Sequence, residues 1–186
     1  EFHSGGNGAS PKSSNIKPYA LWKPSQFLAY QSDPNACLLG PGYLELGQWT
    51  SLIGIGGLGK TRLALWLCLC QITGRRWCEI PTGGHPQKWV ILSTENGIRR
   101  WKSDLEKMLR RFSDAERAVI EEHLLIMAMT PEEIGDLCLG NPESVARIKL
   151  TLSTVGPGAV IFDPFSDMID GDENKAVDVL ATIRTL

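Results

Sequence analysis

The sequence predicts an α/β fold with a mainly parallel β-sheet flanked by helices, on the strength of three observations. Short apolar runs rich in β-branched and aromatic residues alternate with longer segments of helical spacing along the 186 residues. A glycine-rich stretch at 54–61 separates the first such run, 48–53, from a long apolar segment. The last run, 159–163, ends in an aspartate. In parallel sheets of this kind, ligands bind outside the carboxyl ends of the strands.

Composition narrows the class of protein. The formal net charge of −2 gives no overall attraction to nucleic acid or to an anionic membrane. Five cysteines without C-x-x-C spacing and three scattered histidines argue against a disulfide framework and a zinc site. No apolar stretch reaches the roughly 18 residues of a membrane span, and no signal peptide is visible. We therefore expect a cytoplasmic protein with free thiols and no membrane partner.

The N-terminal segment differs from the rest. Residues 1–18 are rich in Gly, Ser, Asn, Lys and Pro, and cannot bury enough apolar surface to offset the entropy of ordering. We expect a disordered tail there, in which Glu1 and Phe2 could be left from cloning. Residues 19–186 are expected to form the folded domain, beginning with a lead-in that contains a helical turn at 25–30.

The glycine-rich stretch matches the phosphate-binding pattern G-x-x-x-x-G-K-[ST] without a mismatch. Glycines let the backbone curl so that successive N–H groups point at phosphate oxygens, while the lysine reaches the β- and γ-phosphates and the threonine hydroxyl binds Mg²⁺. The flanks predict the required context: a strand at 48–53 and a buried helix at 62–72 that stops at Gly74. The expected nucleotide-binding residues are Gly54, Ile55, Gly56, Gly57, Leu58, Gly59, Lys60, Thr61 and the adjoining Arg62.

The remaining elements follow in order. Strands are predicted at 89–94, 124–127 and 159–163, and helices at 97–112, 113–122 and 141–155, with a last helix at 175–186. A Thr-Pro-Glu-Glu sequence at 130–133 marks another helix start. The helix at 97–112 should turn one apolar face to the core, made of Ile98, Trp101, Leu105, Leu109 and Phe112.

Two carboxylates stand at predicted strand ends. Asp163 closes an apolar strand, the arrangement of a Walker B aspartate that meets the Mg²⁺ held by Thr61. The alternative is an aspartate that caps the turn before Pro164. Glu95 follows the strand at 89–94 and should reach the same rim as Lys60, where it could polarise the attacking water. The alternative is a glutamate in a surface loop.

Together these motifs resemble the RecA-like ATPases, and most closely the AAA-domain branch that includes the RepA-type hexameric replicative helicases. The resemblance runs from about residue 26 to residue 186. It implies a RecA-like core, ATP and Mg²⁺ as cofactors, and Lys60 and Glu95 as catalytic residues. The family usually has Asp where this chain has Asn96, and its acidic turn matches 171–174.

The resemblance also implies features that this chain leaves open. Family members carry a basic residue near the nucleotide on the helix after the catalytic glutamate, and Arg99 and Arg100 are the candidates; Arg100 is included in the expected site. A further strand, its sensor residue and an arginine finger would follow Leu186, so we expect a C-terminally truncated core with weak activity of its own.

Three functions remain open on the sequence. The first is a motor on DNA, an ATPase that assembles into a ring or filament. The segment after Asp163 argues against DNA contact there, since it is acidic and contains no Lys or Arg before Lys175. The second is an ATP-binding regulatory switch without motor activity. The third is a P-loop kinase for a small molecule, which would need an arginine-bearing lid that the sequence does not reveal.

Overall fold

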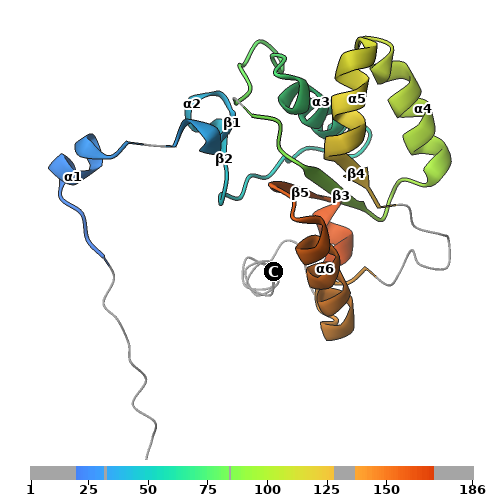
Figure 1. Ribbon diagram of the computed structural model, residues 1–186. Helices are drawn as coiled ribbons and strands as arrows, with labels where there is room; N and C mark the ends of the chain where they lie inside the picture. The colour runs from blue at the N-terminus through green and yellow to red at the C-terminus, as the bar shows by residue number, and fades with distance from the viewer. Residues whose placement is uncertain (1–19, 32, 84, 128–136, 170–186) are drawn as a thin grey trace, which may run out of the picture. The chain divides into compact units, whose positions relative to one another are not determined.

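The computed structural model describes residues 20–31, 33–83, 85–127 and 137–169 (Figure 1). The chain divides into two compact units, Glu1–Ser32 and Asp33–Leu186. Four sequence predictions lie outside the described residues: the tail at 1–18, the helix start at 130–133, the acidic turn at 171–174 and the last helix at 175–186.

The described part of the first unit is a single short helix with an aromatic cluster. Helix α1 (Pro24–Ala29) confirms the predicted helical turn. Its first turn is closed by the Gln26 side chain, which accepts a hydrogen bond from the backbone N–H of Lys23 at 2.9 Å. The Trp22 ring lies 5.3 Å from that of Phe27 and 6.0 Å from that of Tyr30, measured between centroids.

The second unit opens with small elements before the phosphate-binding pattern. A 3₁₀ turn, η1 (Pro34–Ala36), leads into strand β1 (Cys37–Leu39), which pairs antiparallel with β2 (Leu44–Glu45). The short α2 (Gly40–Tyr43) connects them. Backbone hydrogen bonds from Gly40 to Pro81 and from Gly83 to Leu38 fasten this hairpin to the loop after α3.

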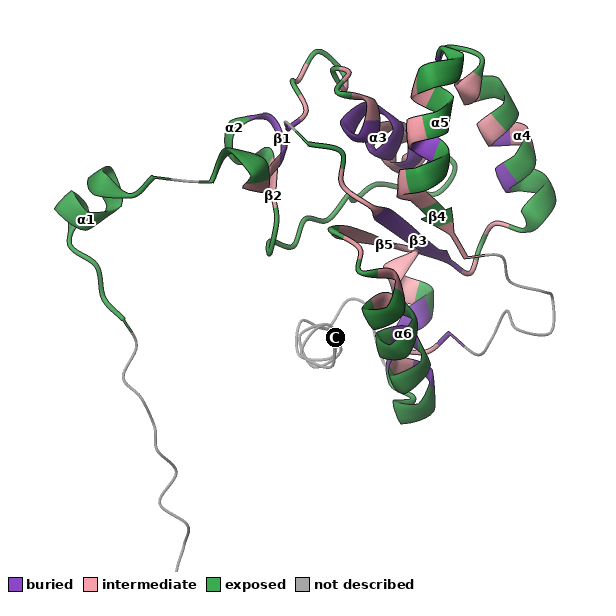
Figure 2. Cartoon of the chain, viewed as in Figure 1, coloured by how far each residue is buried: buried purple, intermediate pink, exposed green. Residues whose placement is uncertain are grey.

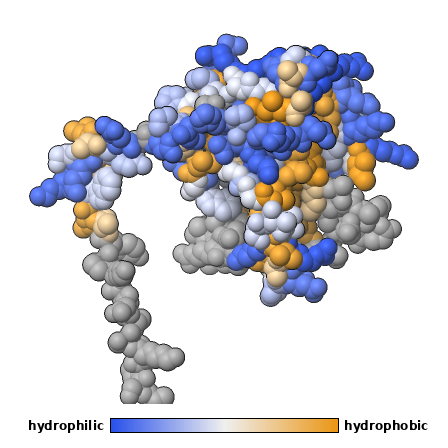
Figure 3. Space-filling view, in the orientation of Figure 1, coloured by the Kyte–Doolittle hydropathy of each residue, from blue (hydrophilic) through white to orange (hydrophobic). Residues whose placement is uncertain are grey.

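The strand predicted at 48–53 is wrong. These residues belong to no strand, and Leu52 and Ile53 are 47% and 90% exposed. Their β-branched and aromatic side chains favour extended backbone, but a strand forms only where a neighbour completes its hydrogen bonds. No described strand forms a ladder with this segment. Gln48 makes hydrogen bonds to Glu45, and the Trp49 ring stacks on Phe162 at 6.4 Å. Apolar side chains consequently reach the surface of this unit among hydrophilic ones (Figure 3).

A three-stranded parallel sheet forms the centre of the second unit. Its order is β4 (Leu124–Ile126), β3 (Trp89–Ser93) and β5 (Ala159–Asp163). The register pairs Ser93 with Asp163, so the ends of β3 and β5 lie side by side. All three strands were predicted from the sequence, and the parallel arrangement is confirmed.

Helices cover both faces of this sheet (Figure 1). Helices α3 (Lys60–Thr73), α4 (Ile98–Leu109) and α5 (Asp114–His123) pack on one face, and α6 (Pro142–Val155) and η2 (Phe165–Met168) on the other. Strand β3 supplies both cores: Trp89 and Ile91 join the first, and Val90 and Leu92 the second. The strand is buried along its length, as the purple ribbon in Figure 2 shows. The chain is therefore an α/β protein, as predicted.

The predicted helix boundaries match the observed ones closely, because the local signals are strong. Gly74 ends α3 in the left-handed conformation, with φ of 69°. Ser113 and Glu116 form a reciprocal capping box at the start of α5. One detail differs: Ile98, predicted to face the core, is 59% exposed. Its place at the first position of α4 lies before the turn that packs on the sheet.

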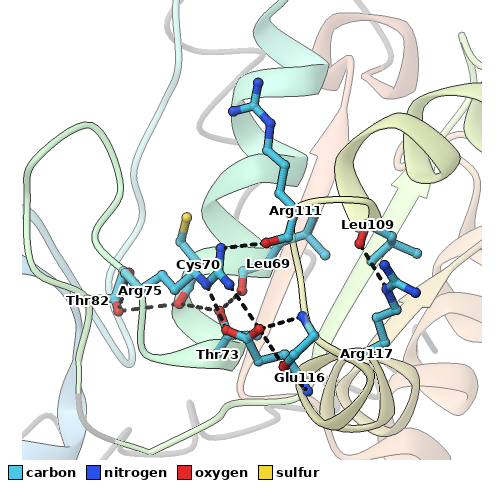
Figure 4. Close-up of polar contacts among 10 residues, drawn as sticks. Leu69, Cys70, Thr73, Arg75, Thr82, Leu109, Arg111, Glu116 and Arg117 are labelled. Carbon is cyan, nitrogen blue, oxygen red and sulfur yellow. Dashed lines mark hydrogen bonds and ion pairs between the residues drawn. The ribbon is translucent and has the colours of Figure 1, made fainter.

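An arginine fastens the end of α3 to the start of α5 (Figure 4). The Arg75 Nε and Nη2 donate to the two carboxylate oxygens of Glu116 at 2.7 and 2.9 Å, and its Nη1 donates to the Arg111 carbonyl at 2.9 Å. The Arg75 guanidinium also lies 4.4 Å from the centre of the Phe112 ring. The hydrogen bonds from Arg75, with those from the backbone and hydroxyl of Ser113, lower the pKa of Glu116 to about 2.

This pairing predicts an acid-sensitive part of the stability. The folded-state pKa of Glu116 lies below that of an ordinary glutamate, so the contribution is complete above about pH 4.5 and is lost as the pH falls towards about 2. Glu116→Gln should lower the melting temperature at neutral pH and flatten its fall through this acid range. Thermal melts at several pH values measure both effects, with Glu121→Gln, an exposed glutamate on the same helix, as the control. Parallel pH profiles for the wild type and Glu116→Gln would contradict the assignment.

In the part of the chain that the structure describes, no helix is long and apolar enough to cross a bilayer. All five cysteines are free.

Candidate functional site

The loop at 54–59 takes a shape that needs glycine at two positions. Gly57 and Gly59 have φ of 80° and 84°, in the left-handed region that other residues rarely adopt. A Cβ atom added at either would meet nothing within 4 Å, so backbone conformation and not crowding demands glycine there. Gly59 is the N-cap of α3, and the loop therefore delivers the chain directly into the helix. The first N–H groups of a helix have no partner within it, which makes a helix start of this kind suited to binding an anion.

Lys60, the first residue of α3, reaches back across the loop. Its Nζ donates to the carbonyl oxygens of Gly54 at 2.7 Å and Ile55 at 3.1 Å. The ammonium group therefore lies at the start of the loop, six residues before its own position. The ammonium group thus puts a positive charge beside the loop backbone that, from the sequence pattern, is expected to bind phosphate.

Thr61 and Asp163 meet although 102 residues separate them. The Thr61 hydroxyl lies 3.0 Å from Oδ1 and 2.9 Å from Oδ2 of Asp163, and both side chains are half-buried. The Nδ2 of Asn96 lies 3.5 Å from Asp163 Oδ2 and donates a long hydrogen bond to it. A hydroxyl and a carboxylate are hard oxygen donors, the kind that Mg²⁺ takes. These two residues consequently fit a magnesium ion bound beside the loop.

Glu95 lies at the same edge of the sheet but stays in solvent. It follows Thr94, whose backbone N–H donates to the carbonyl oxygen of Asp163 at 3.1 Å. The Glu95 carboxylate itself is exposed and has no hydrogen bond or ion pair with any described residue. The structure thus brings together Thr61, Asp163 and Asn96, and leaves Glu95 near them without contact.

Arg62 and Arg100, both expected at the nucleotide, pair with the same carboxylate. Asp104 of α4 accepts from Arg62 at 3.0 Å (Nε) and 2.9 Å (Nη2) through Oδ1, and from Arg100 Nε at 2.9 Å through Oδ2. Burial raises the pKa of Asp104, but the hydrogen bonds and charges of the two arginines outweigh it, so this pKa lies below its usual value. The hydrogen bond to Asp104 raises the pKa of Arg62. Arg99, the other candidate, is exposed and makes no such pair.

The sequence alone did not assign a role to two of these residues, Asp104 and Asn96. Asp104 falls between Trp101 and Leu105, two members of the apolar face predicted for α4. A charged residue on an apolar stripe signals a buried pair, because an isolated buried carboxylate is too costly. Asn96 was noted only as a departure from a family pattern. Its hydrogen bond shows what an amide adds there, a donor for Asp163 in place of a second negative charge.

Other chemistries find no support in the described residues. These contain no group of three or more His, Cys, Asp or Glu side chains that could hold a metal. The helix thiols are poor nucleophiles: burial raises the pKa of Cys68, and it raises that of Cys70 to about 11. The oxygen pair at Thr61 and Asp163 is therefore the best metal site that these residues offer.

The model of a family described as AAA domain matches residues 12–186, nearly the whole chain. No curated protein matches the sequence.

Proposed function

The chain belongs to the AAA domain family, a P-loop ATPase-type family, and from this premise we propose that it binds ATP with Mg²⁺ and hydrolyses it on a RecA-like core. One observation carries the proposal. The hydroxyl at the end of the phosphate-binding pattern lies within 3.0 Å of the carboxylate at the end of β5, so the loop and the sheet edge form one site.

Each residue has a distinct role in this site. The backbone N–H groups of 56–61 and the Lys60 ammonium bind the phosphate oxygens. Thr61 and Asp163 hold the magnesium ion, which, when bound, neutralises charge on the β- and γ-phosphates. Asn96 donates to Asp163 and fixes the orientation of its carboxylate.

Glu95 is the group that we assign to the attacking water. It is the exposed carboxylate at the rim, one residue from the hydrogen bond between Thr94 and Asp163. Its freedom from ion pairs leaves it able to accept a proton or to orient water beside the γ-phosphate. Glu95 would meet the attacking water only when nucleotide is bound, either in its present position or after a movement of its side chain.

Asp163→Asn tests the metal site. The variant keeps the shape of the side chain but removes the charge, so the Mg²⁺ concentration needed for half-maximal ATPase activity should rise by about tenfold or more. Activity measured against a Mg²⁺ series gives this value. Asp167→Asn is the matched control, because Asp167 is an exposed aspartate just after β5. An unchanged Mg²⁺ requirement in Asp163→Asn would place the metal elsewhere.

We further propose that the ATPase works as an oligomeric motor on DNA. Helix α4 supports this with a row of cations. Arg99 and Lys107 of the helix and Arg110, its C-cap residue, fall within one side at spacings of eight and three residues, and all are exposed. Within the described residues they have no acidic partner, whereas Lys102 of the same helix pairs with Glu106. Unpaired cations on one side of a helix suit a phosphate backbone.

Substituting the row by alanine should weaken DNA binding and lower its salt dependence by roughly one unit of slope per cation removed. Titrations of single-stranded DNA at several salt concentrations measure this, with Lys102→Ala as the paired control. DNA-stimulated ATPase activity that the triple variant loses would support a motor. ATP binding without any DNA effect would indicate a regulatory switch, and phosphate transfer to an acceptor other than water would indicate a kinase.

A further inference from the structure

Asp104 is a buried carboxylate close to the proposed site that the functional assignment leaves without a role. It is 4% exposed and lies on the core side of α4. Each of its oxygens is taken by a different arginine, Oδ1 by Arg62 of α3 and Oδ2 by Arg100 of its own helix. The carboxylate therefore joins the first turns of the two helices.

The two arginines keep donors to spare. Their side chains are 46% and 54% exposed, and the Nη1 of each makes no hydrogen bond within the described residues. Two guanidinium groups face a single carboxylate, so the cluster retains one net positive charge. Fixed guanidinium groups with free N–H edges are the usual protein receptors for phosphate oxygens.

Both arginines lie in the first turn of a helix, Arg62 in α3, which follows the phosphate loop, and Arg100 in α4, which follows β3. Arg62 directly follows Thr61, and Arg100 belongs to the first turn of α4, five residues after Glu95. Both helices begin at the carboxyl edge of the sheet, where Thr61 meets Asp163. An arginine free in solvent would sample many rotamers and would lose that freedom on binding a ligand. Asp104 restricts both side chains before any ligand arrives.

We propose that Asp104 is a positioning residue of the nucleotide site, which holds Arg62 and Arg100 together as a preorganised receptor for the phosphate groups of a nucleotide. The inference rests on the proposed ATP binding and deepens it. Loss of the carboxylate would leave both cations in the protein but release them from their common anchor. Affinity should then fall although the site gains positive charge.

Asp104→Asn in the whole chain tests this. Binding of ATP and AMP with Mg²⁺, measured by calorimetry, should show about a tenfold weaker Kd for ATP, with a smaller change for AMP because it has fewer phosphates. Glu106→Gln is the matched control, a carboxylate two residues away on the same helix, 58% exposed and paired with Lys102. A purely structural role would lower the melting temperature but leave the Kd of the folded protein unchanged, and that result would overturn the proposal.

A second comparison removes the arginines. In an Arg62→Ala/Arg100→Ala background, adding Asp104→Asn should weaken ATP binding no further, because the carboxylate acts only through them. An equal loss in both backgrounds, or tighter binding by Asp104→Asn alone, contradicts the positioning role. If Asp104→Asn does not fold, Arg62→Lys/Arg100→Lys keeps the charges around Asp104 but removes the guanidinium forks, and should show the same loss for ATP. Wild-type ATP binding with unchanged variants overturns this inference alone; no ATP binding by the wild type overturns the proposed function with it.

Discussion

Lys60→Ala is expected to abolish measurable ATP hydrolysis and to weaken ATP binding by about 100-fold. The Nζ of Lys60 lies within 3.1 Å of two carbonyl oxygens at the start of the loop, where a phosphate would exchange one partner for a charged one. A hydrogen bond between charged groups contributes up to about 3 kcal/mol, which corresponds to a change in Kd of about 100-fold. Alanine also keeps the helix that begins at this residue, because it has the highest helix propensity.

Calorimetric titration with ATP and a phosphate-release assay measure both effects. Lys102→Ala is the control for general loss of charge, since Lys102 is 74% exposed on α4 and pairs with Glu106. The apo variant should melt at nearly the same temperature as the wild type, because the side-chain hydrogen bonds of Lys60 within the described residues go to the exposed loop. Normal hydrolysis by Lys60→Ala would show that the loop does not bind the transferred phosphate.

Glu95→Gln is expected to lower kcat by about 10²–10³-fold while the Kd for ATP changes by less than about threefold. Glutamine keeps the size of the side chain but cannot accept a proton. Binding should survive because the exposed carboxylate of Glu95 makes no hydrogen bond or ion pair with the described loop residues. Single-turnover hydrolysis with enzyme in excess separates the chemical step from product release.

The comparison for this variant is Glu121→Gln, which changes an exposed glutamate on α5, the helix that precedes β4. A kcat for Glu95→Gln equal to that of the wild type would remove Glu95 from the chemistry. A large rise in Kd together with an unchanged kcat would instead make it a binding residue.

Local signals explain how far the sequence predicted the fold. Helix α3 begins and ends at glycines, α5 begins at a capping box, and α6 begins at an Asn-Pro pair and ends at a glycine. Such signals act within a few residues. Strands β3 and β5 are short apolar runs between such signals. The full burial of β3 and the half-burial of β5 between two helical layers agree with that pattern.

The failure at 48–53 has a different cause. Residues such as Trp49 and Ile53 have high strand propensity, but pairing depends on a partner elsewhere in the chain, which the local sequence does not reveal. The exposure of Ile53, at 90%, shows that the side chain finds no packing surface among the described residues. Strand propensity predicted an extended backbone at 48–53, but it could not predict whether a second strand would pair with it.

The residues of the candidate site also differ in whether local sequence or a contact between distant segments determines them. The loop and Lys60 follow from a contiguous motif, so the sequence was sufficient to name them. The approach of Thr61 to Asp163 was inferred from the rule that strand ends meet at one edge, and the structure places their oxygens within 3.0 Å. Asp104 could not be assigned to Arg62 from the sequence, because 42 residues separate them and the contact depends on how α3 packs beside α4.

The burial of β3 also has a consequence for the order in which parts of the protein open. Its backbone N–H and C=O groups pair with β4 on one side and β5 on the other, and its side chains supply both cores. Amide protons in such a strand exchange with solvent only when the whole unit opens, whereas those of an unpaired segment such as 48–53 exchange through local fluctuation. Among the described residues, we therefore expect the slowest-exchanging amides in β3, which ends at Ser93, two residues before Glu95. Glu95, the proposed water-activating residue, would then follow a strand that opens only with the whole unit. The phosphate loop follows the segment 48–53, which we expect to fluctuate locally.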